Sequence, residues 1–418
     1  KQIFWFSSAP GIWQSVWIES ASDCAIKSLH VRPELEFGAQ SQVARAEFAL
    51  DVKAANSEGA ILRIDVCLPG GEPCFSHEYP ITSGRVSARI PIAKPELWQY
   101  KEGRLYQFRC QLLREGVIMD AVRTWGGLRK VETRWLKGHS PEETPDVSQQ
   151  YKYLYLNDRP FYMIGILDQG FNAFGIYTYR SLNAEGEQGK RGSIAYEIDR
   201  TLAYGYNLSR MHIKENEPLW YHECDRQGLL VWTEHPSNFF AVPDNPEWQA
   251  AYNRELDGML ERLYNHPSIV IVSSINESWG VEGAHCSTPW KNELRYQFLR
   301  KSAERVKALN PQVLVCDNSG FGKTEACEIN DFHFYPSDYF EARRRWEDLV
   351  GRCYPGSIYN CINERHTGDD VGHNLKFRPA NEDHGNIGHA VQTGQPVYVS
   401  EFLHINAIDL QLRMFEKI

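Results

Sequence analysis

The sequence contains no apolar run long enough to cross a lipid bilayer. A transmembrane helix needs about 20 consecutive apolar residues, whereas polar residues interrupt the runs here after a few positions, as they do after IVIV at 269–272. With 42% hydrophobic and 24% charged residues, the composition is typical of a globular protein. We therefore predict no membrane partner.

The sequence also lacks a basic stripe of the kind that binds nucleic acid. The formal net charge is -9, and the densest basic cluster, 343–345 within ARRRWED, has acidic neighbours. Such mixed charge is typical of a solvated helix face, whereas binding to nucleic acid requires many phosphate charges to be neutralised. No nucleic-acid partner is predicted.

Paired cysteines and glycine-rich cofactor motifs are absent as well. The 10 cysteines form no CxxC pair and no Cys/His spacing of a zinc site, and no GxGxxG follows a strand-like run. We predict neither a metal nor a cofactor. Scattered thiols favour a reducing compartment such as the cytoplasm, and leave a periplasmic or secreted location open.

What the first part of the chain does contain is period-two alternation of apolar and polar residues, over 27–131. Turn sequences such as PGGEP and TSG separate the runs, which predicts a compact β-sandwich. The preceding stretch GIWQSVWIES, at 11–20, is interpreted as one further strand, the end of an earlier domain. The alternating runs are SLHVRPEL, ARAEFALDVKA, AILRIDVCL, RVSARIPI, RLYQFRCQLL and VIMDAVRTWGGL.

After a polar linker at 132–150, seven short apolar runs alternate with helical stretches. Strands alternating with helices indicate parallel βαβ units, and seven of them, each ending in polar residues, favour a (β/α) barrel over an open doubly wound sheet. The runs are FYMIGIL, YNLSRMHI, GLLVWTE, SIVIVSSINE, VLVCDN, DFHFY and PVYVSEF.

Carboxylates close three of these predicted barrel strands. Glu234, Glu277 and Glu401 end the third, fourth and seventh. A barrel brings strand ends that are far apart in sequence to one rim, so Glu277 and Glu401 can converge. Two converging carboxyl groups are what glycosidic cleavage requires, one as proton donor and one as nucleophile. The alternative, that either is only a salt-bridged structural residue, stays open at this point.

A series of motifs in a fixed order resembles glycoside hydrolase family 2, the family of β-galactosidases, β-glucuronidases and β-mannosidases. These motifs are GIWQSVWIE, RTWGGLRKVE, YLYLNDRPFYMIGI, YNLSRMHIKENEPLWYHECDRQGLLVWTEHP, HPSIVIVSSINESWG, DNSGF, DFHFY and VYVSEF. The resemblance implies a jelly-roll remnant at 1–26, an immunoglobulin-like β-sandwich at 27–131 and a TIM-barrel catalytic domain at 151–418.

The resemblance also implies roles for individual residues. Glu277 is implied to be the general acid/base and Glu401 the nucleophile. Asn276 is implied to hydrogen-bond the sugar 2-hydroxyl, Arg210 to keep the nucleophile ionised, and Tyr335 to donate to the same carboxylate. We further predict that pocket or substrate contacts come from other strand-end residues, namely His212, Trp232, Glu234, His235, Trp279, Asn318 and His333.

The implied activity is that of a retaining exo-β-glycosidase acting on terminal β-linked sugars, with β-galactosides expected first and β-glucuronides or β-mannosides as alternatives. The predicted partner is therefore a glycoside, oligosaccharide or polysaccharide, and homo-oligomer formation is left open. A non-catalytic carbohydrate-binding protein on the same fold is the competing interpretation. Such a binder has no need of a paired acid and nucleophile.

Two features depart from the family pattern. The sequence ends shortly after Glu401, before the family's eighth barrel strand, so the resemblance implies an incomplete barrel with uncovered strand edges. We expect such a chain to be unstable or inactive alone. The connection at 350–395 is longer than a βα loop should be, and is predicted to form a lid or subsite wall.

Overall fold

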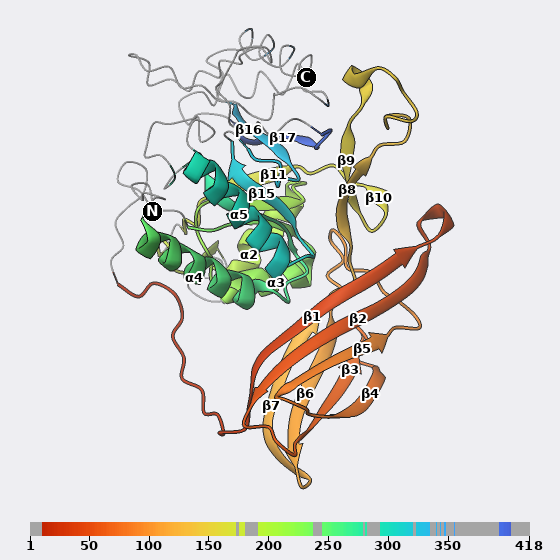
Figure 1. The fold of residues 1–418 in the computed structure, drawn as a ribbon, viewed down its shortest axis with the longest axis vertical. Helices are drawn as coiled ribbons and strands as arrows, with labels where there is room; N and C mark the ends of the chain where they lie inside the picture. The colour runs from red at the N-terminus through yellow and green to blue at the C-terminus, as the bar shows by residue number, and fades with distance from the viewer. Residues whose placement is uncertain are drawn as a thin grey trace.

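The chain folds into a β-sandwich, a small antiparallel sheet and a parallel sheet with helices packed on it (Figure 1). The computed structural model describes residues 11–172, 175–179, 191–236, 245–278, 281, 293–320, 323–334, 340, 343, 347, 355 and 393–402. In Figure 1 the sandwich, red to orange, lies at one end of the molecule and the parallel sheet with its helices at the other.

The sandwich consists of two antiparallel sheets. One has the strand order β1-β2-β5 and the other β4-β3-β6-β7. The strands are β1 (Ala25–Phe37), β2 (Val43–Ala55), β3 (Ile61–Cys67), β4 (Pro73–Pro80), β5 (Arg85–Pro91), β6 (Tyr106–Arg114) and β7 (Val117–Gly126). The predicted sandwich is confirmed. Strand β4 was not predicted, because it is an edge strand with mostly exposed residues and proline at both ends.

Alternate residues of the sandwich strands point inward and build its core. In β5, for example, Val86, Ala88 and Ile90 are buried while the residues between them are exposed. At the centre, the ring of Phe48 meets those of Tyr106 and Phe108 edge-on, with centroids 5.2 and 5.1 Å apart. The period-two pattern in the sequence is thus the inward and outward alternation of two packed sheets.

A second, small antiparallel sheet has the order β10-β9-β8. Its strands are β8 (Val131–Trp135), β9 (Lys152–Leu156) and β10 (Arg159–Pro160). All of strand β8 except Val131 falls within the linker predicted at 132–150. Its pairing with β9 makes the rest of that linker the connection between two neighbouring strands. The pairing was missed because β8, VETRW, is mostly polar and a long polar stretch separates it from β9.

Within the described residues, seven parallel strands form the barrel part of the fold. Five make one sheet in the order β11-β12-β13-β14-β15, and β16 pairs with β17. Their bounds are β11 (Gly165–Asp168), β12 (Leu208–Met211), β13 (Leu230–Glu234), β14 (Ile269–Asn276), β15 (Leu314–Ser319), β16 (Asn330–Phe334) and β17 (Val397–Phe402). All seven predicted barrel strands are therefore present.

Four helices of the described part of the chain accompany this sheet: α2 (Ile194–Ala203), α3 (Pro218–Gln227), α4 (Pro246–Leu263) and α5 (Glu293–Leu309). Their apolar faces share a buried cluster with strands β12 to β15. Within the described residues, no helix is both long and apolar enough to cross a membrane.

The sandwich is joined to the barrel part by buried polar contacts that converge on Asp225 of α3. The indole nitrogens of Trp98 and Trp125 donate to its backbone carbonyl (2.7 Å) and to its carboxylate (2.8 Å), respectively. From the end of the sandwich, the buried guanidinium of Arg129 donates to the carbonyls of Pro267 and Ile269, at 3.0 and 2.6 Å. Because Trp98, Asp225 and Arg129 are buried and Trp125 is partly buried, these bonds fix one domain on the other.

The predicted strand at 11–20 is wrong. Residues 11–24 contain no strand, and Ile12 and Ile18 are 84% and 99% exposed. A strand is stable only when a neighbouring strand completes its hydrogen bonds, and within the described residues nothing pairs with this segment.

Candidate active site

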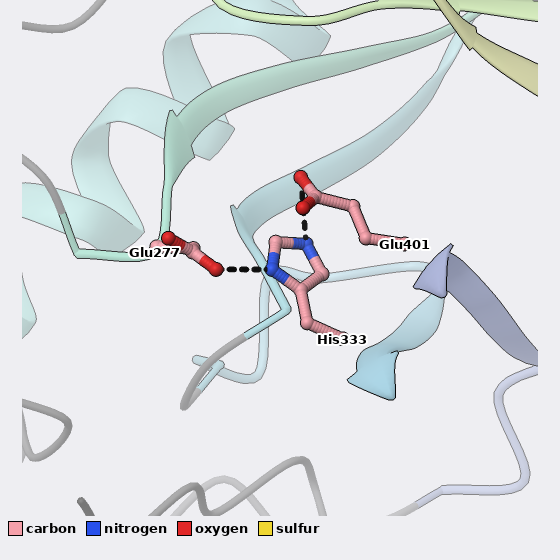
Figure 2. A group of neighbouring side chains, drawn as sticks. All are labelled: Glu277, His333 and Glu401. Atoms are coloured by element: carbon pink, nitrogen blue, oxygen red, sulfur yellow. Dashed lines mark hydrogen bonds and ion pairs between the residues drawn. The ribbon is translucent and has the colours of Figure 1, made fainter. Parts of the chain in front are cut away.

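The carboxyl ends of four barrel strands bring the predicted catalytic side chains together. Arg210 comes from β12, Asn276 and Glu277 from the end of β14, His333 from β16 and Glu401 from β17. Figure 2 shows the His333 ring between the two carboxylates. Segments more than a hundred residues apart in sequence thus converge at one rim, as the barrel interpretation requires.

Arg210 is the central cation of the site. Its guanidinium is buried and donates to Glu401 Oε1 at 2.8 Å, to Asn276 Oδ1 at 2.8 Å and, through Nε, to Glu234 Oε1 at 3.0 Å. Burial by itself would lower the pKa of Arg210, but the carboxylates of Glu234 and Glu401 raise it. The arginine therefore stays charged, and its planar guanidinium orients the side chains of Glu401, Asn276 and Glu234.

Glu401 lies in a cationic environment. Besides Arg210, the ring nitrogens Nε2 of His212 and His333 each lie 3.3 Å from Glu401 Oε1. Burial by itself would raise the pKa of the Glu401 carboxyl, but the two imidazoles and the guanidinium hold that pKa well below its usual range. Glu401 is therefore an ionised carboxylate, the form in which a carboxyl group can act as a nucleophile.

Glu277 occupies a turn with unusual backbone geometry. Glu277 and Ser278 both have positive φ, 50° and 58°, a conformation that costs about 1–2 kcal/mol for a residue with a side chain. The backbone N–H of Glu277 donates to Ser319 O at 3.0 Å, which holds the turn against β15. This strained turn directs the carboxylate toward His333, whose Nδ1 lies 2.5 Å from Glu277 Oε1.

His333 connects the two carboxylates through opposite ring nitrogens. Burial by itself would lower the pKa of His333, but the carboxylates of Glu401 and Glu277 raise it above its usual value. One carboxylate oxygen of Glu277 and one of Glu401 lie within 4.8 Å of each other. A pair this close resembles the roughly 5–5.5 Å separation of retaining glycosidases rather than the 6.5–9.5 Å of inverting ones.

Asn276 presents a buried donor to the site. Its Oδ1 must face Arg210, because a guanidinium can only donate, and this leaves the Nδ2 amide group as the remaining donor of the side chain. That nitrogen is buried and has no hydrogen-bond partner among the described residues. An orphan donor of this kind is costly unless a ligand satisfies it.

The remaining predicted residues fall into two groups. His212 and Glu234 belong to the charged cluster, where Glu234 also accepts from the backbone N–H of Ile213 at 2.8 Å. Asn318 lies beneath the Glu277 turn instead, and its Oδ1 accepts from Ser278 N at 2.8 Å. Trp279 and Tyr335 lie outside the described residues, as does nearly all of the predicted lid at 350–395.

Two further predicted contacts are buried side chains in this structure. Trp232 is buried beneath Arg210, with the guanidinium 5.3 Å from its ring centroid, and its indole N–H donates to Ser273 Oγ at 2.6 Å. His235 is buried against the ring of Tyr252, 4.5 Å away. Burial lowers the pKa of His235 to about 4, so it is neutral at neutral pH.

Comparisons with known proteins identify the family. A model of "Glycosyl hydrolases family 2" matches residues 24–129, and one of "Glycosyl hydrolases family 2, TIM barrel domain" matches residues 197–294. The chain belongs to glycoside hydrolase family 2. The barrel match includes Arg210, Asn276 and Glu277, and it ends before His333 and Glu401.

Two curated relatives bear the names of different glycosidases. A beta-galactosidase of Enterobacter cloacae is 27% identical over 297 residues, which cover 63% of this chain and 26% of that protein. A putative beta-glucuronidase of Formosa agariphila is 24% identical over 275 residues, covering 64% of this chain and 29% of that protein. The family 2 chain thus spans between 26% and 29% of the length of these relatives.

A solved structure supports the fold of this family 2 chain. The beta-glucuronidase of Parabacteroides merdae superimposes with a TM-score of 0.61 at 16% identity, covering 79% of this chain and 38% of that one. At this identity the likeness establishes the sandwich-and-barrel fold and leaves the substrate to be determined from the site.

Three side chains of the family 2 site carry nitrogen and oxygen atoms of the kind that coordinate metal ions. Atoms of Glu277, His333 and Glu401 all lie within 4.8 Å of one another. Both nitrogens of the His333 ring, however, already face a carboxylate, one on each side. A metal ion would have to displace one of these carboxylates, so the geometry favours a proton-bearing bridge over a metal centre.

Residues that the sequence analysis missed lie directly behind the family 2 site. Asp331 and Lys323 form a fully buried ion pair, with 2.5 Å between Lys323 Nζ and Asp331 Oδ1. Asp331 stands two positions before His333, at the start of the DFHFY run, and an acidic residue inside an apolar strand was the available signal. Nothing in the sequence around Lys323 predicted its burial.

Proposed function

We propose that this chain carries the catalytic centre of a retaining exo-β-glycosidase that hydrolyses terminal β-linked sugars. The observation that supports this most directly is the pairing of two carboxylates with different surroundings. Glu401 is buried among cationic groups and ionised, while Glu277 is only partly buried, and an oxygen of each lies within 4.8 Å of the other.

In the proposed first step, Glu401 attacks the anomeric carbon and Glu277 protonates the departing glycosidic oxygen. The sugar is then joined to Glu401 as an ester, and the aglycone leaves. In the second step Glu277, now deprotonated, removes a proton from water as that water attacks the anomeric carbon. The sugar is released with its original β-configuration, and both carboxyl groups return to their starting forms.

The charged neighbours of the two carboxylates fit these steps. Arg210 and His212 stabilise the ionised Glu401 before attack and after release of the sugar. The orphan Nδ2 of Asn276 is available to a sugar hydroxyl beside the reacting carbon. We propose the 2-hydroxyl as its partner, because a hydrogen bond there strengthens as charge develops in the transition state.

We propose β-galactosides as the first substrates to test, with β-glucuronides next and β-mannosides third. The first two are the substrates indicated by the names of the curated relatives. Aryl β-glycosides of these three sugars, assayed side by side, decide among them.

A covalent trap tests the proposal itself. A 2-deoxy-2-fluoro β-glycoside with a good leaving group should accumulate the sugar ester, and peptide mass spectrometry should find the added mass on the peptide containing Glu401. The Glu401→Gln variant is the matched control, since it keeps the size of the side chain and removes the nucleophile. Sugar binding without any labelling would instead indicate a non-catalytic carbohydrate-binding protein.

A further inference from the structure

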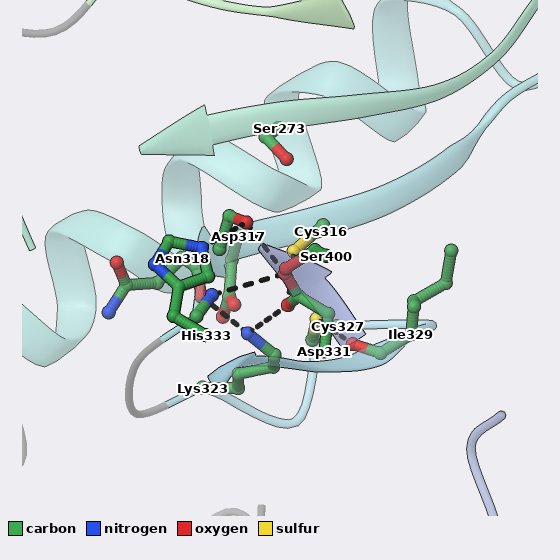
Figure 3. Close-up of polar contacts among 12 residues, drawn as sticks. Ser273, Cys316, Asp317, Asn318, Lys323, Cys327, Ile329, Asp331, His333 and Ser400 are labelled. Atoms are coloured by element: carbon green, nitrogen blue, oxygen red, sulfur yellow. Dashed lines mark hydrogen bonds and ion pairs between the residues drawn. The ribbon is translucent and has the colours of Figure 1, made fainter. Parts of the chain in front are cut away.

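Behind the catalytic rim, one carboxylate oxygen contacts segments from two different strands. Asp331 Oδ2 accepts hydrogen bonds from the hydroxyl of Ser319 at 2.6 Å and from the hydroxyl of Ser400 at 2.5 Å. It also accepts from the backbone N–H of Gly320 at 3.1 Å. Figure 3 shows Asp331, Lys323 and Ser400 converging at this point.

Each of the two serines is linked through the backbone to one of the candidate catalytic residues. Ser319 receives the backbone N–H of Glu277 on its carbonyl oxygen at 3.0 Å. Ser400 precedes Glu401 in β17, and its carbonyl oxygen accepts from Arg210 at 3.2 Å. Asp331 therefore links the turn that carries Glu277 to the strand that carries Glu401.

Lys323 fixes the position of this linking carboxylate. Its side chain is fully buried, and its ammonium group lies 2.5 Å both from Asp331 Oδ1 and from the carbonyl oxygen of Asn318. The amide of Asn318 in turn holds the backbone N–H of Ser278 at 2.8 Å and its hydroxyl at 3.0 Å. The cation thus connects to the Glu277 turn by a second route.

The ionisation of Asp331 determines the direction of the hydrogen bonds that it shares with the two serine hydroxyls. Burial by itself would raise the pKa of Asp331, but the ammonium of Lys323 holds that pKa well below its usual range. An ionised carboxylate only accepts hydrogen bonds, so both serine hydroxyls must donate to it. Their orientations are fixed as a result.

We propose that the Lys323–Asp331 pair is a positioning device that sets the separation between Glu277 and Glu401. This inference rests on the proposed glycosidase function. A buried ion pair is a weak source of net stability compared with apolar packing, and its better-attested contribution is to specify one arrangement. Here the arrangement specified is the distance between a proton donor and a nucleophile, and a misplacement of about 1 Å can reduce catalysis roughly a hundredfold.

Single hydroxyl deletions test this without breaking the ion pair. Ser319→Ala and Ser400→Ala each remove one donor to Asp331, and each should lower kcat about tenfold with little change in KM, because geometry and not binding is altered. Ser400→Thr keeps a hydroxyl and should stay close to the unmodified protein. The control is Ser302→Ala on α5, which removes a buried hydroxyl bonded to Phe298 O at 2.8 Å, away from the rim.

The double variant distinguishes positioning from independent local effects. If both serines act through one oxygen to fix a single distance, removing the second hydrogen bond adds little to the effect of removing the first. The kcat of Ser319→Ala/Ser400→Ala should therefore fall far less than the product of the two single effects. Multiplicative losses, or unchanged kcat in both single variants, would overturn the inference. An unmodified protein that neither turns over nor labels Glu401 would instead refute the glycosidase function, so the two failures are distinguishable.

Discussion

The orphan amide of Asn276 allows its contact with substrate to be measured in isolation. Asn276→Ala removes the Nδ2 donor, which is buried and already desolvated in the resting site. A hydrogen bond to a group that gains charge contributes about 1.5–3 kcal/mol, which corresponds to a roughly 10- to 150-fold loss in kcat/KM. The loss should appear mainly in kcat, because the bond strengthens in the transition state.

The same substitution also removes an acceptor from Arg210 Nη2, and this disturbance does not depend on the substrate. Comparing an aryl β-glycoside with its 2-deoxy counterpart separates the two effects. The 2-deoxy substrate has no hydroxyl to lose, so the substitution should slow its hydrolysis much less than that of the parent glycoside. An equal loss on both substrates would show that Asn276 only supports Arg210.

Four further substitutions, the last serving as a control, test the electrostatics and the packing. The neighbouring carboxylates raise the pKa of His333 above 6.5 in the folded state. The protonated ring therefore stabilises the fold fully below pH 6.5, and this contribution is lost as pH rises through the folded pKa, by about 1.4 kcal/mol for each pH unit between the unfolded and folded pKa values. Thermal denaturation of His333→Asn should show no such loss of stability at higher pH. Arg129→Met removes buried charged hydrogen bonds between sandwich and barrel, and urea denaturation should show a loss of about 3–5 kcal/mol; an unchanged midpoint would contradict the described junction. Gly228→Ala places a Cβ 2.5 Å from the Gln99 carbonyl oxygen at φ 75°, whereas a Cβ at Gly59, with φ 69°, meets open space. We expect Gly228→Ala to lower the free energy of unfolding by about 3 kcal/mol and Gly59→Ala by about 1 kcal/mol. Equal losses of stability would rule out the predicted clash.

The barrel strands could be predicted because burial on both faces leaves a continuous apolar run. IVIVSSIN of β14 is buried at every position, and polar residues at the ends of such runs pointed to the rim. Glu277 and Glu401 could be placed there since parallel strands share one carboxyl edge. The pattern therefore indicated which residues meet, without their hydrogen-bond partners.

What the sequence could not show depends on contacts between distant segments. Glu234 was predicted as a pocket contact, and only the structure shows its buried pairing with Arg210. The burial of Lys323 has no local signature, because a lysine after a turn is usually solvated. The segment at 11–20 has the composition of a strand, but strand formation depends on a partner that local sequence does not reveal.

The junction at Asp225 has a consequence for protein engineering. The indole N–H of Trp98 donates to the backbone carbonyl of Asp225 and that of Trp125 to its carboxylate, both from the sandwich. From the barrel side, His266 Nδ1 at 2.6 Å and the backbone N–H of Ser268 at 2.9 Å contact the carboxylate. A chimera that takes its sandwich from one relative and its barrel from another would leave these groups unmatched wherever the two parents differ at these positions. Successful recombination should therefore require both tryptophans and the aspartate to be inherited together, as a single unit that crosses the domain boundary.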